Sequence, residues 1–97
     1  MKLKEELVED AHVFFHPVRY RIVELLAEKP MHINAISIAM GEERRLVSYH
    51  LNMLEEHGFL TSKYEISLEK KSKGKALRKY TVTDKVAKVI SELKKEL

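Results

Sequence analysis

The sequence predicts an α+β domain that is mainly α-helical and carries one small antiparallel β-hairpin. Apolar residues recur at helical spacing along most of the chain, which is typical of amphipathic helices. Only the stretch KYEISLE, at residues 63–69, alternates with a period of two, which indicates a half-buried strand. The length of 97 residues fits a single domain over residues 1–97, and no internal repeat or low-complexity linker divides it.

Two helices are expected in the first third of the chain. Residues 3–15 place apolar side chains on one face and acidic side chains on the others, and His16–Pro17 interrupts this pattern. Pro17 suits the first turn of a second helix, which runs to about Lys29 and is stopped by Pro30.

A pair of helices separated by a glycine follows. The first is short, at about residues 33–40, and Gly41 supplies the turn after it. The second covers about residues 43–57, and Gly58 ends it as a C-terminal cap residue. Its apolar stripe comprises Leu46, Val47, His50, Leu51 and Leu54.

The predicted hairpin joins residues 63–69 to a returning strand at residues 76–82 through the turn KKSKGK. The side chains expected to face the core are Tyr64, Ile66 and Leu68 in the first strand and Tyr80 and Val82 in the second. Thr83 or Asp84 caps a last helix that runs to Leu97.

Two helices joined by a tight turn and followed by a two-stranded ribbon form a winged helix-turn-helix. The helix-turn-helix then spans about residues 33–57, the wing about 59–82 and a C-terminal dimerisation helix about 84–97. The second helix of such a pair fits the DNA major groove, and a basic ribbon tip reaches phosphates or the minor groove beside it. The sequence therefore predicts a DNA-binding domain.

The charge distribution favours the same function but leaves an alternative open. The chain has a net charge of +3, and residues 59–82 hold seven Lys and Arg residues against two Glu. Such a basic segment is typical of a footprint for a polyanion, although a solvated lysine-rich hairpin would have the same composition. Residues 1–58 instead hold ten acidic residues against seven basic ones. This negative half supports the alternative of a winged-helix module that binds another protein, without specific DNA binding.

The candidate DNA contacts lie on the second helix of the pair and at the wing tip. The helix face opposite the apolar stripe carries Arg44, Arg45, Ser48, Tyr49 and Asn52. Arginine suits guanine or phosphate, asparagine suits adenine, and serine and tyrosine suit phosphate or base edges. The candidate phosphate contacts in the wing are Lys70, Lys71, Lys73 and Lys75, followed by Arg78 and Lys79.

Two carboxylates, Glu42 and Glu43, precede these arginines on a helix that is expected to meet a polyanion. A carboxylate at a helix N-terminus stabilises the helix by about 0.3–1 kcal/mol, which is the simpler explanation. Alternatively, Glu43 accepts a hydrogen bond from cytosine N4 or holds Arg44 or Arg45 in position. The arginine side chains are long enough to reach past both carboxylates, so the acidic start weakens the prediction of DNA binding without refuting it.

Three stretches of the chain resemble ArsR-like winged-helix transcription regulators: HPVRYRIVELLAEKP, MGEERRLVSYHLNMLEEHGFL and RKYTVTDK. The middle stretch carries the family pattern VSxHLxxLxxxGxx, which begins at Val47. The resemblance implies a homodimeric repressor or activator that binds an inverted repeat in double-stranded DNA. Metal sensing is not implied, because the family's sensors use cysteines or Asp/His/Glu sets. This chain has no cysteine, and its last helix has no histidine.

The first and last helices are expected to form the dimer interface. Their apolar stripes exceed what a small winged core needs and would stay exposed in a monomer. A two-fold dimer would cover them and place two recognition helices about one DNA turn apart. The residues predicted to meet the partner are Leu3, Leu7, Phe14, Val86, Ile90, Leu93 and Leu97.

Other classes of function find no support in the sequence. Without cysteine, disulfides and thiolate metal sites are excluded, and His12 and His16 lack a third ligand, so neither a metal nor another cofactor is expected. No nucleophile–base set or glycine-rich phosphate loop indicates an enzyme. No apolar run reaches the roughly 18 residues of a membrane span and no signal peptide is evident, so we expect a cytoplasmic protein without a membrane partner.

Overall fold

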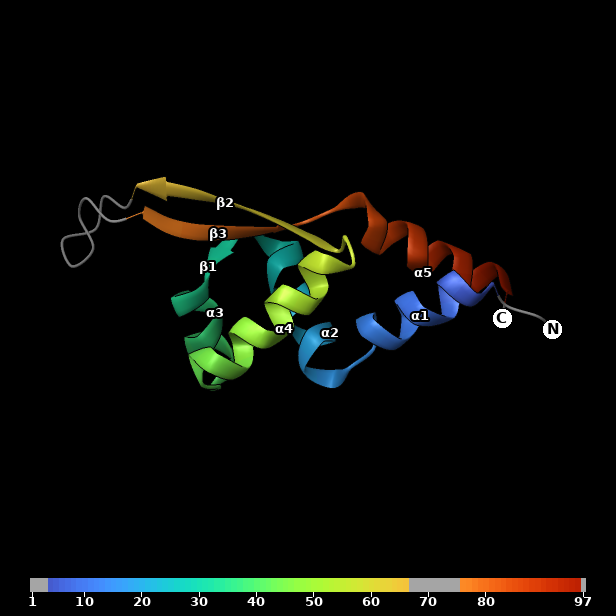
Figure 1. The fold of residues 1–97 in the computed structure, drawn as a ribbon, viewed down its shortest axis with the longest axis horizontal. Coiled ribbons are helices and arrows are strands. Elements are labelled where there is room, and N and C mark those ends of the chain that lie inside the picture. The colour runs from blue at the N-terminus through green and yellow to red at the C-terminus, as the bar shows by residue number, and fades with distance from the viewer. Residues whose placement is uncertain (1–3, 67–75, 97) are drawn as a thin grey trace.

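The computed structural model describes residues 4–66 and 76–96 of the chain. Its elements are, in order, α1 (Glu5–Phe14), α2 (Pro17–Glu28), β1 (Met31–His32), α3 (Ile33–Met40), α4 (Arg44–Glu56), β2 (Leu60–Ile66), β3 (Ala76–Val82) and α5 (Asp84–Glu96). The molecule is elongated, with extents of 55 × 23 × 20 Å. Helices α1 and α5 occupy one end, the β2–β3 hairpin points to the other, and α2, α3 and α4 fill the middle (Figure 1). The predicted order of helices and hairpin is confirmed.

The sheet has three antiparallel strands in the order β1–β3–β2, one more than the predicted hairpin. In the hairpin, Leu60 pairs with Val82 and Ile66 pairs with Ala76. The additional strand, β1, is only two residues long and pairs with residues 79–80 of β3. So short a segment carries no periodicity, which is why the sequence indicated only two strands.

The core lies between the helices and the start of the hairpin. Its most deeply buried side chains, at most 1% exposed, are Phe14, Ile22, Leu26, Ile36, Val47, Leu51, Leu54, Phe59 and Leu60. The rings of Phe14 and Phe59 stack with their centroids 5.3 Å apart, which ties α1 to the segment that leads from α4 into the wing. Truncating a buried leucine or isoleucine in such a core typically costs about 2–5 kcal/mol. Helix α4 is therefore held in place by a well-packed core.

Glycines end both helices of the helix-turn-helix. Gly41 and Gly58 have φ angles of 67° and 81°, in the left-handed region that residues with a Cβ disfavour. After α4, the amide of Gly58 donates to Glu55 O at 3.0 Å and the amide of Phe59 donates to Leu54 O at 2.9 Å. The predicted end of this helix at Gly58 is confirmed, with His57 as the C-cap residue and Gly58 directly after it, and this turn sets the direction in which the chain enters the wing.

The hairpin extends beyond the core, which corrects the predicted burial of its first strand. Tyr80 is buried and Val82 packs against the core, as predicted. The alternating pattern also predicts that Tyr64 and Ile66 face the core, but they are 68% and 70% exposed. The helices cover only the start of the hairpin (Figure 1), so the alternation continues past the surface that could bury it. The third predicted residue, Leu68, lies outside the described residues.

Helices α1 and α5 pack against each other within a single chain (Figure 1). The sequence predicts that Leu7 and Phe14 are exposed in a monomer, but they are only 4% and 1% exposed. This prediction is wrong because the chain's own core and α5 already cover both side chains. The other predicted interface residues divide into Val86, Ile90 and Leu93, which are partly buried, and Leu3 and Leu97, which lie outside the described residues.

Candidate nucleic-acid interface

Helix α4 separates its side chains into a buried stripe and an exposed face. The buried side chains are Val47, His50, Leu51 and Leu54. On the opposite face lie the five predicted DNA contacts, of which Arg44, Arg45, Tyr49 and Asn52 are exposed and Ser48 is half-buried. At about 100° per residue, these five positions fall within an arc of about 140°. Leu46, which the periodicity assigned to the apolar stripe, is 38% exposed at its edge.

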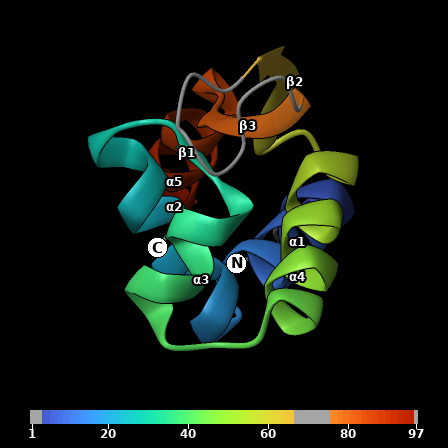
Figure 2. The same cartoon turned by 90° about the vertical axis from the view of Figure 1, so that its left-hand side faces the viewer.

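Helices α3 and α4 and the hairpin lie toward the same end of the molecule, opposite the end that α1 and α5 occupy (Figure 1). Figure 2 views this end, with α3 and α4 packed side by side below the sheet and the hairpin above them. The turn between α3 and α4 lies at the bottom of that view. The helix-turn-helix and the wing are therefore placed so that one extended ligand could meet both.

The start of α4 carries the two carboxylates that precede the arginines. Glu43 is the N-cap residue, with an extended backbone, but its side chain makes no capping hydrogen bond. Both Glu42 and Glu43 are exposed to solvent. Any stabilisation that Glu43 gives to the helix end would therefore come from its charge and not from a capping hydrogen bond.

A buried polar cluster joins α2 to the middle of α4. Arg19 is 6% exposed, its Nε donates to Val13 O at 2.7 Å, and its Nη1 lies 3.4 Å from His50 Nδ1. Because a guanidinium group only donates, His50 Nδ1 accepts and the ring proton is on Nε2. Burial lowers the pKa of His50, and the nearby charges of His16 and Arg19 lower it further. The pKa of His16, whose ring centroid lies 4.6 Å from that of His50, is lowered by burial and then by Arg19 and His12.

Three side chains tie the wing to the last turn of α4. Arg78 Nη2 donates to Glu55 Oε1 at 2.6 Å, and Arg78 Nε donates to Ser62 Oγ at 2.7 Å. Ser62 Oγ in turn donates to Glu55 Oε2 at 2.6 Å. The sequence places Arg78 among the phosphate contacts, but in the structure its charge is already paired within the chain.

The other face of the wing carries a second set of polar contacts. Lys79 Nζ and His32 Nε2 lie 3.6 Å and 3.1 Å from the same oxygen, Glu65 Oε1. His32 Nδ1 also lies 3.2 Å from Arg78 O, so β1 is attached to both strands of the hairpin. The four predicted wing contacts Lys70, Lys71, Lys73 and Lys75 lie outside the described residues.

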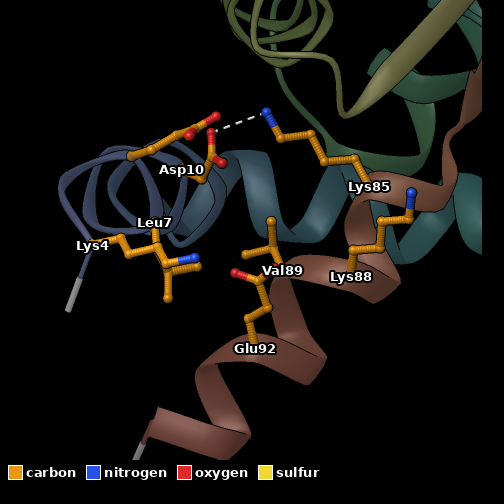
Figure 3. Close-up of a pocket in the computed structure, with 8 residues that line it drawn as sticks. Lys4, Leu7, Asp10, Lys85, Lys88, Val89 and Glu92 are labelled. Atoms are coloured by element: carbon orange, nitrogen blue, oxygen red, sulfur yellow. Dashed lines mark ion pairs between the residues drawn. The ribbon is translucent and has the colours of Figure 1, made fainter.

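Helices α1 and α5 border a pocket of about 220 Å³ (Figure 3). At its edge, Lys85 Nζ lies 3.0 Å from Asp10 Oδ1, and it donates to His57 O at 2.6 Å. The same ammonium group is 5.0 Å from the centre of the Phe59 ring. One side chain therefore connects α1, the end of α4 and α5, which sequence reasoning missed because the partners are far apart in the chain.

Metal-binding clusters and membrane-spanning helices are both absent from the parts of the chain that the structure describes. Within residues 4–66 and 76–96, no three His, Cys, Asp or Glu side chains gather as a metal site. None of the helices in those ranges is long and apolar enough to cross a lipid bilayer.

Comparisons with known proteins show which family the chain belongs to. The profile of a family described as a helix-turn-helix domain matches residues 14–63, whereas no curated protein matches the sequence. A solved structure described as a possible transcriptional regulator for arsenical resistance has a TM-score of 0.72 at 22% identity, over 97% of this chain and 84% of that one. An ArsR-family transcriptional regulator has a TM-score of 0.74 at 13% identity, over 99% and 91%.

A third structure is described as the homodimeric winged helix-turn-helix DNA-binding domain of a possible ArsR-family regulator from Mycobacterium bovis. It has a TM-score of 0.71 at 20% identity, over 93% of this chain and 76% of that one. At such identities these matches establish the fold, and they agree with the motifs in the sequence. Because the family profile covers half of the chain, the protein belongs to the helix-turn-helix domain family, and its fold is the winged helix-turn-helix of the solved structures that it resembles.

Proposed function

We propose that the protein is a homodimeric transcription regulator that binds specific sequences in double-stranded DNA. The observation that carries this proposal is the exposed polar arc of α4, which is backed by a fully buried stripe on a helix that packs against β2 of the wing. An α-helix of this kind fits the major groove, where each base pair presents a distinct pattern of donors and acceptors. Helix α4 is therefore the proposed recognition helix.

The side chains on this arc supply the chemistry for reading bases. Arg44 and Arg45 can donate two hydrogen bonds to guanine, and Asn52 can pair with adenine N6 and N7. Ser48 and Tyr49 suit phosphate oxygens or base edges, which fixes the position of the helix in the groove. The exposure of Tyr49, at 56%, leaves its hydroxyl group accessible for such a contact.

The wing supplies sequence-independent affinity in this proposal. Lys70, Lys71, Lys73 and Lys75 would neutralise phosphates next to the groove that α4 occupies. Changing Lys71 and Lys73 to alanine should then weaken binding to every duplex alike. The slope of log affinity against log salt concentration should shrink by about 0.9 for each phosphate that is no longer neutralised.

The proposed dimer forms through the end of the molecule that α1 and α5 build. Val8 of α1 is 49% exposed there, and the structural neighbour from Mycobacterium bovis is itself described as a homodimer. The proposed contacts are Leu3, Val8, Val86, Ile90, Leu93 and Leu97, with Leu7 and Phe14 supporting them from inside their own chain. A two-fold pair would present two α4 helices to an inverted repeat.

The decisive experiment selects bound sequences from random duplex DNA and then compares variants on the selected site. Arg44→Ala or Arg45→Ala should weaken binding to that site more than to random DNA, by about 1–3 kcal/mol if the arginine makes a bidentate pair with a base. Lys94→Ala removes a positive charge from α5, at the opposite end of the molecule, and is the matched control. Equal weakening on selected and random DNA would contradict base reading by α4.

A protein-interaction module is the second candidate. It is favoured by Ile38 of α3, which is 82% exposed, and by the exposed pair Glu42 and Glu43 at the start of α4. On this alternative the same face of the helix-turn-helix would dock on a protein. If Glu43→Ser and Arg44→Ala both leave DNA binding untouched, α4 is not in the groove and this alternative replaces the first.

A further inference from the structure

The contact between the wing and α4 is a closed ring of three hydrogen bonds. It links Glu55 in the last turn of α4, Ser62 in β2 and Arg78 in β3, and each partner comes from a different element. Both oxygens of the Glu55 carboxylate are used, one by Arg78 and one by Ser62. Charge-assisted bonds of this kind are short and directional, so they restrict the angle between the elements that they join.

The plane of the Arg78 guanidinium group is also held by its neighbours in the sheet. Its central carbon lies 5.3 Å from the ring centre of Tyr80 and 6.0 Å from that of Tyr64. Tyr80 is buried in the core, whereas Tyr64 is exposed on the part of the hairpin that extends beyond it. Arg78 therefore lies at the boundary between the supported and the unsupported part of the wing.

The strand register places this ring on the face of the hairpin that looks toward α4. Ser62 pairs with Tyr80 and Tyr64 pairs with Arg78, so all four share one face. Beyond this point that face has no buried residue among those described, since Ile66 is 70% exposed. The ring is thus the outermost described attachment of this face of the wing to the helices.

We propose that Glu55 and Arg78 are positioning residues, which set the angle of the wing so that its lysines meet phosphates beside the base pairs read by α4. This inference rests on the proposed function and deepens it. It assigns Arg78 to the geometry of the wing and not to a direct phosphate contact. It also assigns a role in DNA binding to an acidic residue, Glu55, that does not touch the DNA.

Whether Glu55→Gln strengthens or weakens DNA binding distinguishes a positioning role from a simple effect of charge. If only charge matters, Glu55→Gln removes a negative charge and should strengthen DNA binding, whereas Arg78→Met removes a positive charge and should weaken it. If the ring positions the wing, both substitutions should weaken binding. Each phosphate that the wing no longer neutralises should lower affinity about fivefold at 0.15 M salt and reduce the salt slope by about 0.9.

Two further variants sharpen the comparison. Arg78→Lys keeps the charge but lacks the planar fork, so a positioning role predicts that it binds as weakly as Arg78→Met. Glu56→Gln removes the same charge from the exposed neighbour of Glu55 and should leave affinity unchanged or slightly raised. Ion pairs as exposed as this one contribute little to folding stability, so unfolding midpoints of all variants should stay close to that of the wild type.

The experiment measures the affinity and salt slope of the wild type and these variants on the selected duplex. The inference is supported if Glu55→Gln, Arg78→Met and Arg78→Lys weaken binding with a smaller slope, and if Glu55→Gln combined with Arg78→Met is no worse than either alone. It is overturned if the wild type binds the selected duplex and Glu55→Gln shows the same affinity and salt slope as Glu56→Gln. If the wild type binds no duplex, the proposed function itself fails and this inference fails with it.

Discussion

Replacing Lys85 by methionine removes one ammonium group that three elements share, while keeping most of the length of the side chain. The Asp10 side chain is 12% exposed and would be left without its partner, and His57 O at the end of α4 would be left without a cation. Leaving a buried acceptor unsatisfied costs about 1–3 kcal/mol, and a cation at a helix C-terminus contributes about 0.3–1 kcal/mol. Lys85 itself is 34% exposed, so solvent screening keeps the cost of the unpaired Asp10 carboxylate at the low end of its range.

These terms together predict that Lys85→Met destabilises the fold by about 2 kcal/mol, or about 10 °C in unfolding midpoint for a domain of this size. Urea and thermal unfolding followed by circular dichroism, at one fixed protein concentration, measure it. Lys88→Met is the matched control, because Lys88 lines the same pocket but, among the described residues, makes no ion pair. It should change the free energy of unfolding by less than about 0.5 kcal/mol.

A double-mutant cycle tests the physical reason as well as the size. Asp10→Asn combined with Lys85→Met should cost clearly less than the sum of the two single substitutions, because each single change leaves the other group without its partner. If the free-energy costs of the two single substitutions add up in the double variant, the ion pair does not stabilise this junction. If Lys85→Met lowers the free energy of unfolding no more than Lys88→Met does, the hydrogen bond to His57 O also has no effect on stability.

The histidines, the glycines and the acidic start of α4 each provide a further test. The pKa values of His16 and His50 in the folded chain are lowered from the usual 6.5, so the unfolded chain takes up protons before the folded chain does as the pH falls. The free energy of unfolding should therefore be highest above about pH 6.5 and decrease below it, which urea unfolding across this range measures. Gly41→Ala and Gly58→Ala should each cost about 1 kcal/mol because both positions have a positive φ, and an unchanged or higher free energy of unfolding would contradict this. Glu43→Ser should raise affinity for random duplex DNA, because it removes a carboxylate from the groove-facing end of α4, and an unchanged affinity would argue against that placement.

The sequence predicted best those elements whose signals are local. The helix at residues 33–40 was predicted with its observed bounds, because Pro30 and Gly41 bracket it in the sequence. The exposed arc of α4 also followed from spacing alone, since a helix repeats every 3.6 residues wherever it lies. Both features depend on residues within one or two turns of each other.

The features that the sequence did not predict depend on distant partners. A period of two indicates that Tyr64 and Ile66 share a face, but whether helices lie beneath them depends on where the core ends. Arg78 was assigned to phosphate because its partner Glu55 is 23 residues away, and Lys85 lies 75 residues from Asp10. No local pattern marks pairs at such separations, so basic residues that hold the fold together look the same in sequence as those free to meet DNA.

The elongated outline of the chain has a consequence for how it moves through solution. Its radius of gyration is 14.9 Å, whereas a compact globule of this length would have about 12.5 Å. By the same scaling, 14.9 Å is the radius of a compact protein of about 150 residues. On a gel-filtration column a single chain should therefore elute between the positions of a globular monomer and a globular dimer. Light scattering, which reports mass independently of shape, should instead give about twice 11.4 kDa for the proposed dimer. A mass of 11.4 kDa for the free protein, together with a complex that holds no dimer on the duplex, would refute it.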